Sequence, residues 1–195
     1  MKVAVVGAGN GGCAVAADMA YRGLDVTLVK TSNAVHDDNF TYLQENNGKM
    51  TLIDFGENGC MNPDEVEKVE KTGYINCVTR DVSKLADMDV IIIYVQTNYH
   101  ESVIKKISEY IRDGQIIMIN PGYFSTAYVL KYCKTQDITI VEAQSSFIDG
   151  RIMEPGKFKV GFRNVRNPLG VFPSRNLEYA KEKLNQLGFP FHYMN

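Results

Sequence analysis

The sequence lacks the features that mark several specialised classes of protein. It has no run of about 20 apolar residues, the length that a helix needs to cross a bilayer. Its opening run Met1–Val6 breaks at Gly7, too early for a signal peptide. It has no basic excess either, since 21 Lys and Arg stand against 23 Asp and Glu and the formal net charge is −2, whereas nucleic-acid binders usually carry surplus positive charge. We therefore expect a cytoplasmic protein that binds neither membranes nor nucleic acid.

Cysteine is scarce as well. Cys13, Cys60, Cys77 and Cys133 form no C-x-x-C pair, and their spacing matches no zinc pattern. We expect free thiols in a reducing compartment and no metal site.

What the sequence does have is an ordinary globular composition, with 45% hydrophobic and 23% charged residues. A chain of 195 residues can bury a core without disulfides, and because no linker interrupts it we predict one domain over residues 1–195.

Short apolar runs alternate with helical patterns along the chain as far as Ala143. Strands are predicted over 3–6, 26–29, 50–60 (with a turn), 74–78, 90–95, 115–119 and 138–141. Helices are predicted over 10–22, 33–47, 102–111 and 126–133, and an exposed helical turn over 64–71. Such alternation is typical of α/β proteins in which helices cover both faces of a doubly wound, mainly parallel sheet.

The pattern changes after Ala143. Residues 157–163 and 170–172 are predicted to be antiparallel strands, separated by the turn residues Asn167 and Pro168. A final helix is predicted over 176–187 and a last short strand over 189–193. The C-terminal part should therefore add antiparallel strands to the parallel sheet.

A glycine-rich segment, G-A-G-N-G-G, lies between the first strand and the first helix. In this G-x-G-x-x-G pattern Gly7 allows a tight turn, Gly9 lets a diphosphate approach the backbone, and Gly12 lets the helix pack closely on the strands. The N–H groups and dipole at the start of the helix can then bind the anion. The alternative is a glycine-rich turn without a ligand. We predict a Rossmann-type dinucleotide site that includes Gly7, Gly9, Asn10, Gly11 and Gly12.

The second strand ends in a cation where NAD-binding sequences of this type carry an acid. That acid binds the ribose 2′-hydroxyl of NAD, but here the strand is followed by Lys30, Thr31 and Ser32. Asp25 precedes the strand and so lies at its far end. A lysine attracts a 2′-phosphate, so we predict NADP as the cofactor, with NAD possible. The alternative is that Lys30 is a solvated surface lysine.

Further strand ends should line the same crevice, because ligands of such sheets bind at the carboxyl ends of parallel strands. The segments concerned are 94–98, 120–122 and 142–145, although 120–122 could also be an ordinary loop. From these segments we predict cofactor contacts by Val95, Gln96, Asn120, Pro121, Gly122 and Glu142.

Four segments in this order resemble the opine dehydrogenase family, which includes the octopine, nopaline and N-(carboxyethyl)norvaline dehydrogenases. They are Gly7–Gly12, Ala86–Ile92, Gly114–Gly122 and Glu142–Ser146. The resemblance extends over almost the whole chain, from Lys2 to Tyr193. It implies that the complete enzyme uses NAD(P)H to condense a 2-oxo acid reductively with the amine of an amino acid. A homodimer is possible.

The resemblance also implies a helical second domain that carries the substrate pocket and an acid/base histidine, and we expect that domain to lie outside residues 1–195. None of His36, His100 and His192 matches that histidine, so no catalytic residue is predicted here. His100 opens a helix after the central strand and lies either near the cofactor or simply at a helix start. Two other functions stay open: a stand-alone NADP-binding sensor or partner subunit without catalysis, and a dehydrogenase domain similar to ketopantoate reductase.

Overall fold

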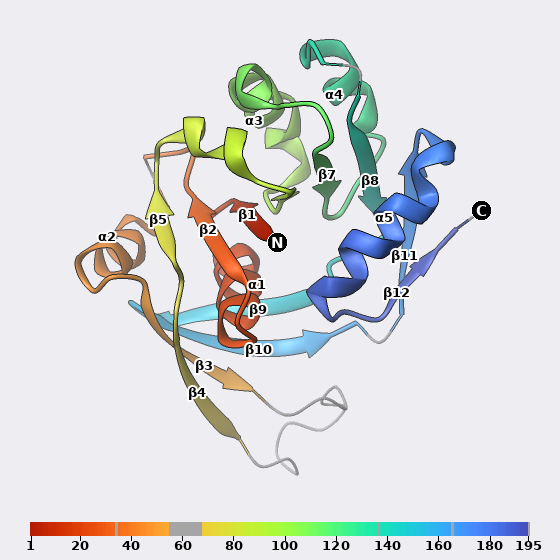
Figure 1. The fold of residues 1–195 in the computed structure, drawn as a ribbon. Helices are drawn as coiled ribbons and strands as arrows, with labels where there is room; N and C mark the ends of the chain where they lie inside the picture. Colours follow the sequence, from red (N-terminus) through yellow and green to blue (C-terminus); the bar gives the residue numbers. More distant parts are fainter. Residues whose placement is uncertain (34, 55–67, 136, 165, 195) are drawn as a thin grey trace.

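The computed structural model describes residues 1–33, 35–54, 68–135, 137–164 and 166–194. These residues form two sheets, one of eight strands and one of four. Figure 1 shows helix α1 (Asn10–Tyr21) lying between the two sheets. Within the described ranges, no helix has the length and apolarity required to cross a membrane.

The large sheet has the strand order β12-β11-β8-β7-β6-β1-β2-β5. Its strands are β1 (Lys2–Val6), β2 (Asp25–Val29), β5 (Cys77–Thr79), β6 (Val90–Ile93), β7 (Ile116–Ile119), β8 (Thr139–Ala143), β11 (Asn167–Phe172) and β12 (Phe191–Tyr193). The six strands from β5 to β8 are parallel, and their order is the 3-2-1-4-5-6 order of doubly wound dinucleotide-binding folds. Strand β11 runs antiparallel to β8, and β12 runs parallel to β11. The predicted fold class is confirmed.

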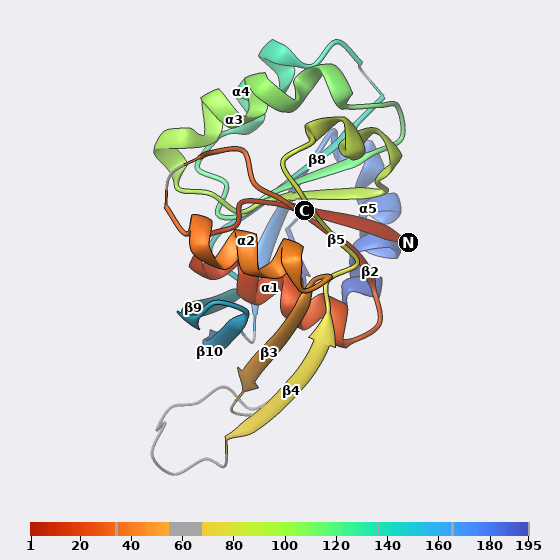
Figure 2. The same cartoon turned by 90° about the vertical axis from the view of Figure 1, so that its left-hand side faces the viewer.

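Each face of the large sheet has its own apolar core, because successive side chains of a strand point to opposite faces. Val3 and Val5 face α1 and α5 (Leu177–Leu184), while Ala4 and Val6 face the other side. That side is covered by the 3₁₀ helix η1 (Val82–Asp87), α3 (His100–Ile107) and α4 (Thr126–Tyr132). Figure 2 shows α3 and α4 above the sheet and α1 below it.

The small sheet covers the outer side of α1. Its strand order is β4-β3-β10-β9, with β3 (Lys49–Asp54), β4 (Val69–Tyr74), β9 (Ile148–Glu154) and β10 (Lys157–Arg163). The contact is close, because a Cβ atom added at Gly150 of β9 would overlap the Cβ of Ala14. Since α1 lies between two sheets, it is buried on nearly all sides. This explains its small apolar residues, because a wider helix could not fit there.

Two predictions about the middle of the chain are wrong. Residues 69–71 belong to strand β4 and not to a helical turn, because they pair with β3 over the whole length of both strands. The predicted core strand over 74–78 is the end of β4 followed by the short strand β5, which among the described strands pairs with β2 alone. The predicted segments 55–60 and 64–67, with Cys60, lie outside the described residues. Helix α2 (Asp37–Glu45) is shorter than predicted, and it starts after His36, whose φ is 62°.

The C-terminal prediction is partly wrong. Strand β9 was not predicted, and it is the strand that pairs with β10. The two predicted strands therefore lie in different sheets, and Asn167 and Pro168 begin β11 instead of forming a turn. The Asn167 side chain is buried and donates to the Ser145 carbonyl at 2.7 Å, which ties β11 to the end of β8. The final helix and last strand are confirmed as α5, its 3₁₀ extension η5 (Asn185–Leu187) and β12.

Candidate functional site

The glycine loop joins β1 to α1 at the carboxyl edge of the sheet. Gly7 has a φ of 128°, which glycine adopts without strain, and its N–H donates to the Val29 carbonyl of β2 at 2.9 Å. A Cβ atom at Gly7 would clash with the Tyr94 carbonyl that follows β6, and one at Gly12 would clash with the Gly7 carbonyl. These two glycines therefore allow the loop to close tightly between neighbouring strand ends and the helix.

Gly9 is the residue at which this loop is open. It precedes the first residue of α1, and none of the described side chains caps the helix. A Cβ atom added there would have no described atom within 4 Å. The first N–H groups of a helix have no acceptor within the helix, and the helix dipole favours an anion beside them. The space at Gly9 thus suits the approach of a diphosphate.

Tyr94, directly after β6, packs against the start of α1. A Cβ at Gly11 would lie 2.6 Å from its ring, so Gly11 must lack a side chain for the ring to lie there. The ring meets Phe147 edge-on with centroids 5.6 Å apart, and the hydroxyl donates to the Ile148 carbonyl of β9. Burial raises the pKa of Tyr94 to about 12, so it stays protonated near neutral pH. Sequence reasoning placed Tyr94 at the crevice but did not recognise this role.

Asn10 also connects α1 to β9. Its side-chain oxygen accepts a hydrogen bond from the Ile152 N–H at 2.9 Å. That oxygen is used in holding the small sheet against the helix start. Contact between Asn10 and a cofactor stays a prediction.

The end of β2 holds a cluster of charged side chains. Lys30 is only 3% exposed, and its Nζ lies 2.9 Å from Asp37 Oδ1 and donates to the Val35 carbonyl at 2.6 Å. Lys30 is therefore not a solvated surface lysine. The hydrogen bonds from Lys30 and Arg80 hold the pKa of Asp37 below its ordinary value, so this carboxylate is ionised.

Arg80 is the cation that sequence reasoning missed. It follows β5, and its Nη2 lies 2.8 Å from Asp37 Oδ1 while its guanidinium lies over the Phe40 ring at 4.6 Å. It also donates to the Ser32 carbonyl. Thr31 precedes Ser32, and the Thr31 carbonyl accepts a hydrogen bond from Lys106 Nζ at 2.8 Å. No local pattern indicated Arg80, because only the pairing of β2 with β5 brings it to this position.

Glu142 is the second-last residue of β8, and its side chain binds the loop that follows β7. Its carboxylate accepts hydrogen bonds from the Phe124 N–H at 2.8 Å, the Thr126 N–H at 2.5 Å and the Thr126 hydroxyl at 2.7 Å. A Cβ at Gly122 would lie 2.5 Å from the Glu142 Cβ, so the glycine allows this close approach. Glu142 thus supports the start of α4, and a cofactor contact by it stays a prediction.

The same loop presents two aromatic side chains at the rim of the crevice. Tyr123 and Phe124 have φ values of 53° and 65°, a left-handed conformation that is strained for such residues. They are 69% and 83% exposed. The hydrogen bond from Phe124 to Glu142 helps to fix this strained backbone. The only sequence signal at this position was the N-P-G segment before them.

Asn120, at the end of β7, is fully buried, and neither its side-chain oxygen nor its nitrogen has a hydrogen-bond partner among the described residues. The Tyr94 hydroxyl lies nearby; because it donates its own proton to the Ile148 carbonyl, it can only accept from the Asn120 nitrogen, and the Asn120 oxygen is left without a donor. An unpaired buried amide costs about 1–3 kcal/mol. A polar ligand group or water that reaches Asn120 would remove that cost.

His100 joins the loop after β6 to the loop after β7. It is fully buried; its Nε2–H donates to the Val95 carbonyl at 3.1 Å, and its Nδ1 accepts from the Ser125 hydroxyl at 2.7 Å. Burial lowers the pKa of His100, which favours this neutral form. Val95 packs near Gly7, whereas Gln96 is exposed. His100 therefore supports the crevice and is not open to it.

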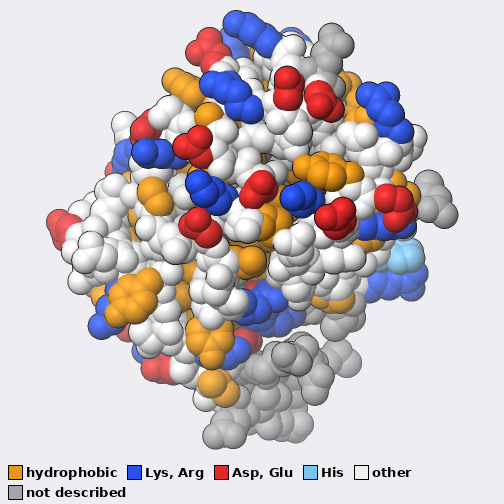
Figure 3. Space-filling model, viewed as in Figure 1, with side chains coloured by type: hydrophobic (Ala, Val, Ile, Leu, Met, Phe, Trp, Pro, Cys, Tyr) orange, Lys and Arg blue, Asp and Glu red, His pale blue; other side chains and the backbone are white. Residues whose placement is uncertain are grey.

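These residues meet at one edge of the sheet, because the parallel strands all end there. At this edge lie an open helix start at Gly9, the buried amide of Asn120, and the two cations Lys30 and Arg80 around Asp37. Among the described residues, no group of three or more His, Cys, Asp or Glu side chains is arranged to hold a metal ion. On the face drawn in Figure 3, acidic and basic side chains lie side by side.

Comparison with known proteins identifies the family. The family model for ketopantoate reductase PanE/ApbA matches residues 3–143. The chain belongs to this family. An opine dehydrogenase from Arthrobacter sp. (strain 1C) is 27% identical over 189 residues, which cover 94% of this chain and 48% of that protein. This agrees with the resemblance to opine dehydrogenases inferred from the sequence.

Solved structures of this PanE/ApbA-type fold superimpose over the whole chain. Octopine dehydrogenase, in a complex with NADH and L-arginine, gives a TM-score of 0.80 at 16% identity and is covered to 48% of its length. The PanE/ApbA family ketopantoate reductase from Ralstonia eutropha JMP134 gives 0.66 at 16% identity and is covered to 57%. The chain thus spans about half the length of the relatives it matches.

Proposed function

We propose that this chain is the dinucleotide-binding part of an opine-type dehydrogenase, an oxidoreductase that condenses a 2-oxo acid reductively with the amine of an amino acid. The observation that carries the proposal is the open start of α1 at Gly9, at the switch point between β1 and β6. Similarity to an opine dehydrogenase along nearly the whole chain supports it. The similar octopine dehydrogenase structure contains NADH, which supports a nicotinamide dinucleotide as the cofactor.

The residues present fit such a cofactor. Gly7 to Gly12 would hold the diphosphate, the ends of β2 and β5 would hold the adenosine ribose, and Asn120 would bind a polar group of the nicotinamide half. Bound there, the dinucleotide supplies the hydride. The chain's own residues orient the dinucleotide: Tyr94 and His100 fix the loops around it, and the buried, unpaired Asn120 amide favours one polar partner at that point.

We propose NADP as the physiological cofactor. Lys30 and Arg80 supply two cations at the end of β2, and Asp37 neutralises only one of them. The remaining positive charge favours a 2′-phosphate. NAD is the second candidate, because the Asp37 carboxylate could instead accept hydrogen bonds from ribose hydroxyls.

A reduction similar to that of ketopantoate reductase is the second candidate reaction, favoured by the family match over residues 3–143. The two reactions differ in what they consume. Ketopantoate reduction needs one oxo substrate, whereas opine formation needs an oxo acid and an amine together.

The substitution Gly9→Val tests the proposed binding site. A branched side chain at the open position would occupy the space that the diphosphate needs, so calorimetry should show loss of NADPH binding while circular dichroism shows a retained fold. The matched control is Gly161→Val in β10, where the one described atom within 4 Å of an added Cβ is the Asp149 carbonyl oxygen at 3.7 Å. Unchanged NADPH affinity in a folded Gly9→Val protein would overturn the assignment.

A further inference from the structure

A cavity of about 300 Å³ lies at the edge of the large sheet opposite the glycine loop. It is formed where α4 ends and β8 begins, and β11 closes it, since Phe172 at the end of β11 pairs with Ile140 near the start of β8. The dinucleotide crevice lies at the other, carboxyl ends of the parallel strands. A ligand in this cavity would therefore bind apart from the proposed cofactor.

The wall of the cavity is mainly apolar. Its apolar lining consists of Val129, Leu130, Ile138, Ile140, Phe172 and Pro173. Leu130 and Phe172 are 55% and 47% exposed, so part of the apolar wall is open to solvent. Cys133 also lines the wall, and burial raises its pKa to about 11, so the thiol is uncharged near neutral pH. The interior thus suits a hydrocarbon group.

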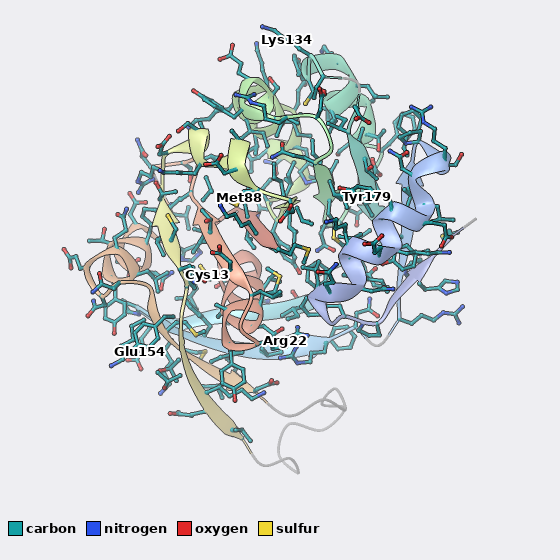
Figure 4. The ribbon with its side chains drawn as sticks, in the orientation of Figure 1. Cys13, Arg22, Met88, Lys134, Glu154 and Tyr179 are labelled. Carbon is teal, nitrogen blue, oxygen red and sulfur yellow. The ribbon has the colours of Figure 1, made fainter. Side chains whose placement is uncertain are left out.

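The charged lining residues of the cavity are both cations. Lys134 and Arg175 make no ion pair with any residue in the described part of the chain, and no Asp or Glu is among the lining residues. The neighbouring Lys131, by contrast, pairs with Glu101 at 3.0 Å. Thr135 also lines the cavity, but its hydroxyl donates to Asp113. Figure 4 shows Lys134 at the outer end of this region, beyond α4.

We propose that this cavity binds an apolar monocarboxylate. The two cations, without an acidic neighbour in the lining, select a negative head group, and the apolar wall selects a hydrocarbon body. A volume of about 300 Å³ is at the lower end for small-molecule sites and fits a ligand on the order of ten non-hydrogen atoms. The proposal is independent of the dinucleotide site.

Calorimetry with octanoate tests the proposal. The probe 1-octanol has the hydrocarbon body without the charge, and inorganic phosphate has negative charge without a hydrocarbon body. Octanoate should bind saturably at one site per chain, at least fivefold more tightly than 1-octanol, and phosphate should show no saturable binding. Octanoate should bind equally well in the presence of saturating NADPH. Failure of octanoate to saturate, equal affinity for octanoate and 1-octanol, or direct competition with NADPH would each overturn the proposal.

Variants of the cavity provide the structural test. Arg175→Gln and Lys134→Gln should each weaken octanoate binding about two- to fivefold, as expected for partly exposed ion pairs. Leu130→Asp, on an exposed wall position, should abolish binding. Lys49→Gln on β3 is the matched control and should leave affinity unchanged. If Lys49→Gln weakens binding as much as Arg175→Gln, the assignment is wrong. If wild type is a dimer that Leu130→Asp dissociates, a second copy is the occupant and the proposal fails.

Discussion

Lys30, Asp37 and Arg80 are the charged side chains at the end of β2, where we propose that the adenosine ribose of the cofactor binds. Lys30 is buried and tied to Asp37 and the Val35 carbonyl, so it sets the position of the carboxylate. Arg80 is more exposed and shares that carboxylate. The cation best placed to meet a 2′-phosphate is thus one that the sequence pattern did not single out.

Arg80→Gln should reduce the preference for NADPH over NADH. A hydrogen bond to a charged group contributes about 1.5–3 kcal/mol, and each 1.4 kcal/mol is about tenfold in affinity. We expect roughly a 10-fold loss for NADPH and little change for NADH, with both effects smaller at high salt. Titration of both cofactors into wild type, Arg80→Gln and the control Lys49→Gln measures this. Equal affinity of the wild type for both cofactors would make the chain NAD-dependent.

His100 should make stability depend on pH. Its folded pKa lies below the ordinary value of about 6.5 because the ring is buried. Below pH ~6.5 the unfolded chain therefore binds a proton that the folded chain resists, so stability is present above this pH and is lost as pH falls through the folded pKa. Glu142, the charged group that acts on the ring, opposes this shift.

Urea unfolding between pH 5 and 8 measures the effect of His100. The wild type should lose stability below pH ~6.5, and His100→Gln should lower stability at neutral pH but flatten this pH dependence. His192→Gln, on an exposed residue of β12, is the control and should keep the wild-type slope. An identical slope in wild type and His100→Gln would contradict the assignment.

At the scale of elements, a buried charge cluster joins α1 to the small sheet. Arg163 of β10 lies 2.6 Å from Asp18 of α1 and 2.7 Å from Asp54 of β3, and both carboxylates are almost fully buried. Burial opposes the charge on Asp54, but Arg163 and Lys71 outweigh it and lower its pKa. The cluster thus specifies how three elements meet.

Arg163→Met should destabilise the fold strongly. Removing one partner of a buried ion pair costs about 3–5 kcal/mol, because the other charge is left buried. Arg22 still pairs with Asp18 and Lys71 with Asp54, so we expect a loss of unfolding free energy at the lower end of this range. Urea unfolding measures it, with Arg151→Met on the neighbouring strand β9 as the control. A loss below about 1 kcal/mol, the usual value of an exposed pair, would show that the cluster is not important for stability.

The same elements show why sequence reasoning recovered most of the large sheet but only β3 and β10 of the small one. Strands β1, β6 and β7 are buried on both faces, so they stand out as continuous apolar runs. Strand β4 is mostly exposed and rich in charge, and it therefore resembled a helical turn. Strand β3 pairs with β10, which lies more than a hundred residues further along the chain, and no local pattern reports such a partner.

The candidate site likewise has one part that the sequence predicts and another part that depends on contacts between distant segments. The glycine loop was recognisable because its glycines are required by the local backbone. A Cβ at Gly12, for example, would clash with the Gly7 carbonyl. Arg80 and the buried position of Lys30 depend on β5 pairing with β2. The support of the crevice by Glu142 and His100 depends on contacts across strand ends, which a sequence pattern does not specify.

At the scale of the whole molecule, none of His36, His100 and His192 is an accessible acid/base group at the carboxyl ends of the central strands β1, β6 and β7. His100 is buried between Val95 and Ser125, His36 opens α2, and His192 lies on β12 beside Arg166. Substrate pockets usually lie between domains, and the chain spans about half the length of the opine dehydrogenase it resembles. These observations lead us to expect cofactor binding without turnover from this chain.

We therefore expect the isolated chain to bind NADPH and to oxidise none of it. The pure chain is incubated with NADPH, pyruvate and a panel of amino acids, and then with ketopantoate alone, while absorbance at the nicotinamide band is followed and binding is measured by calorimetry in the same preparation. Oxidation that needs both pyruvate and an amino acid would show that the catalytic groups of an opine-type enzyme lie within these residues. Oxidation with ketopantoate alone would favour the ketopantoate-reductase reaction. Binding without oxidation is the expected result. The second half of a related opine dehydrogenase is then added as a separate chain. An incomplete enzyme gains turnover in this mixture, whereas a stand-alone NADP-binding subunit does not.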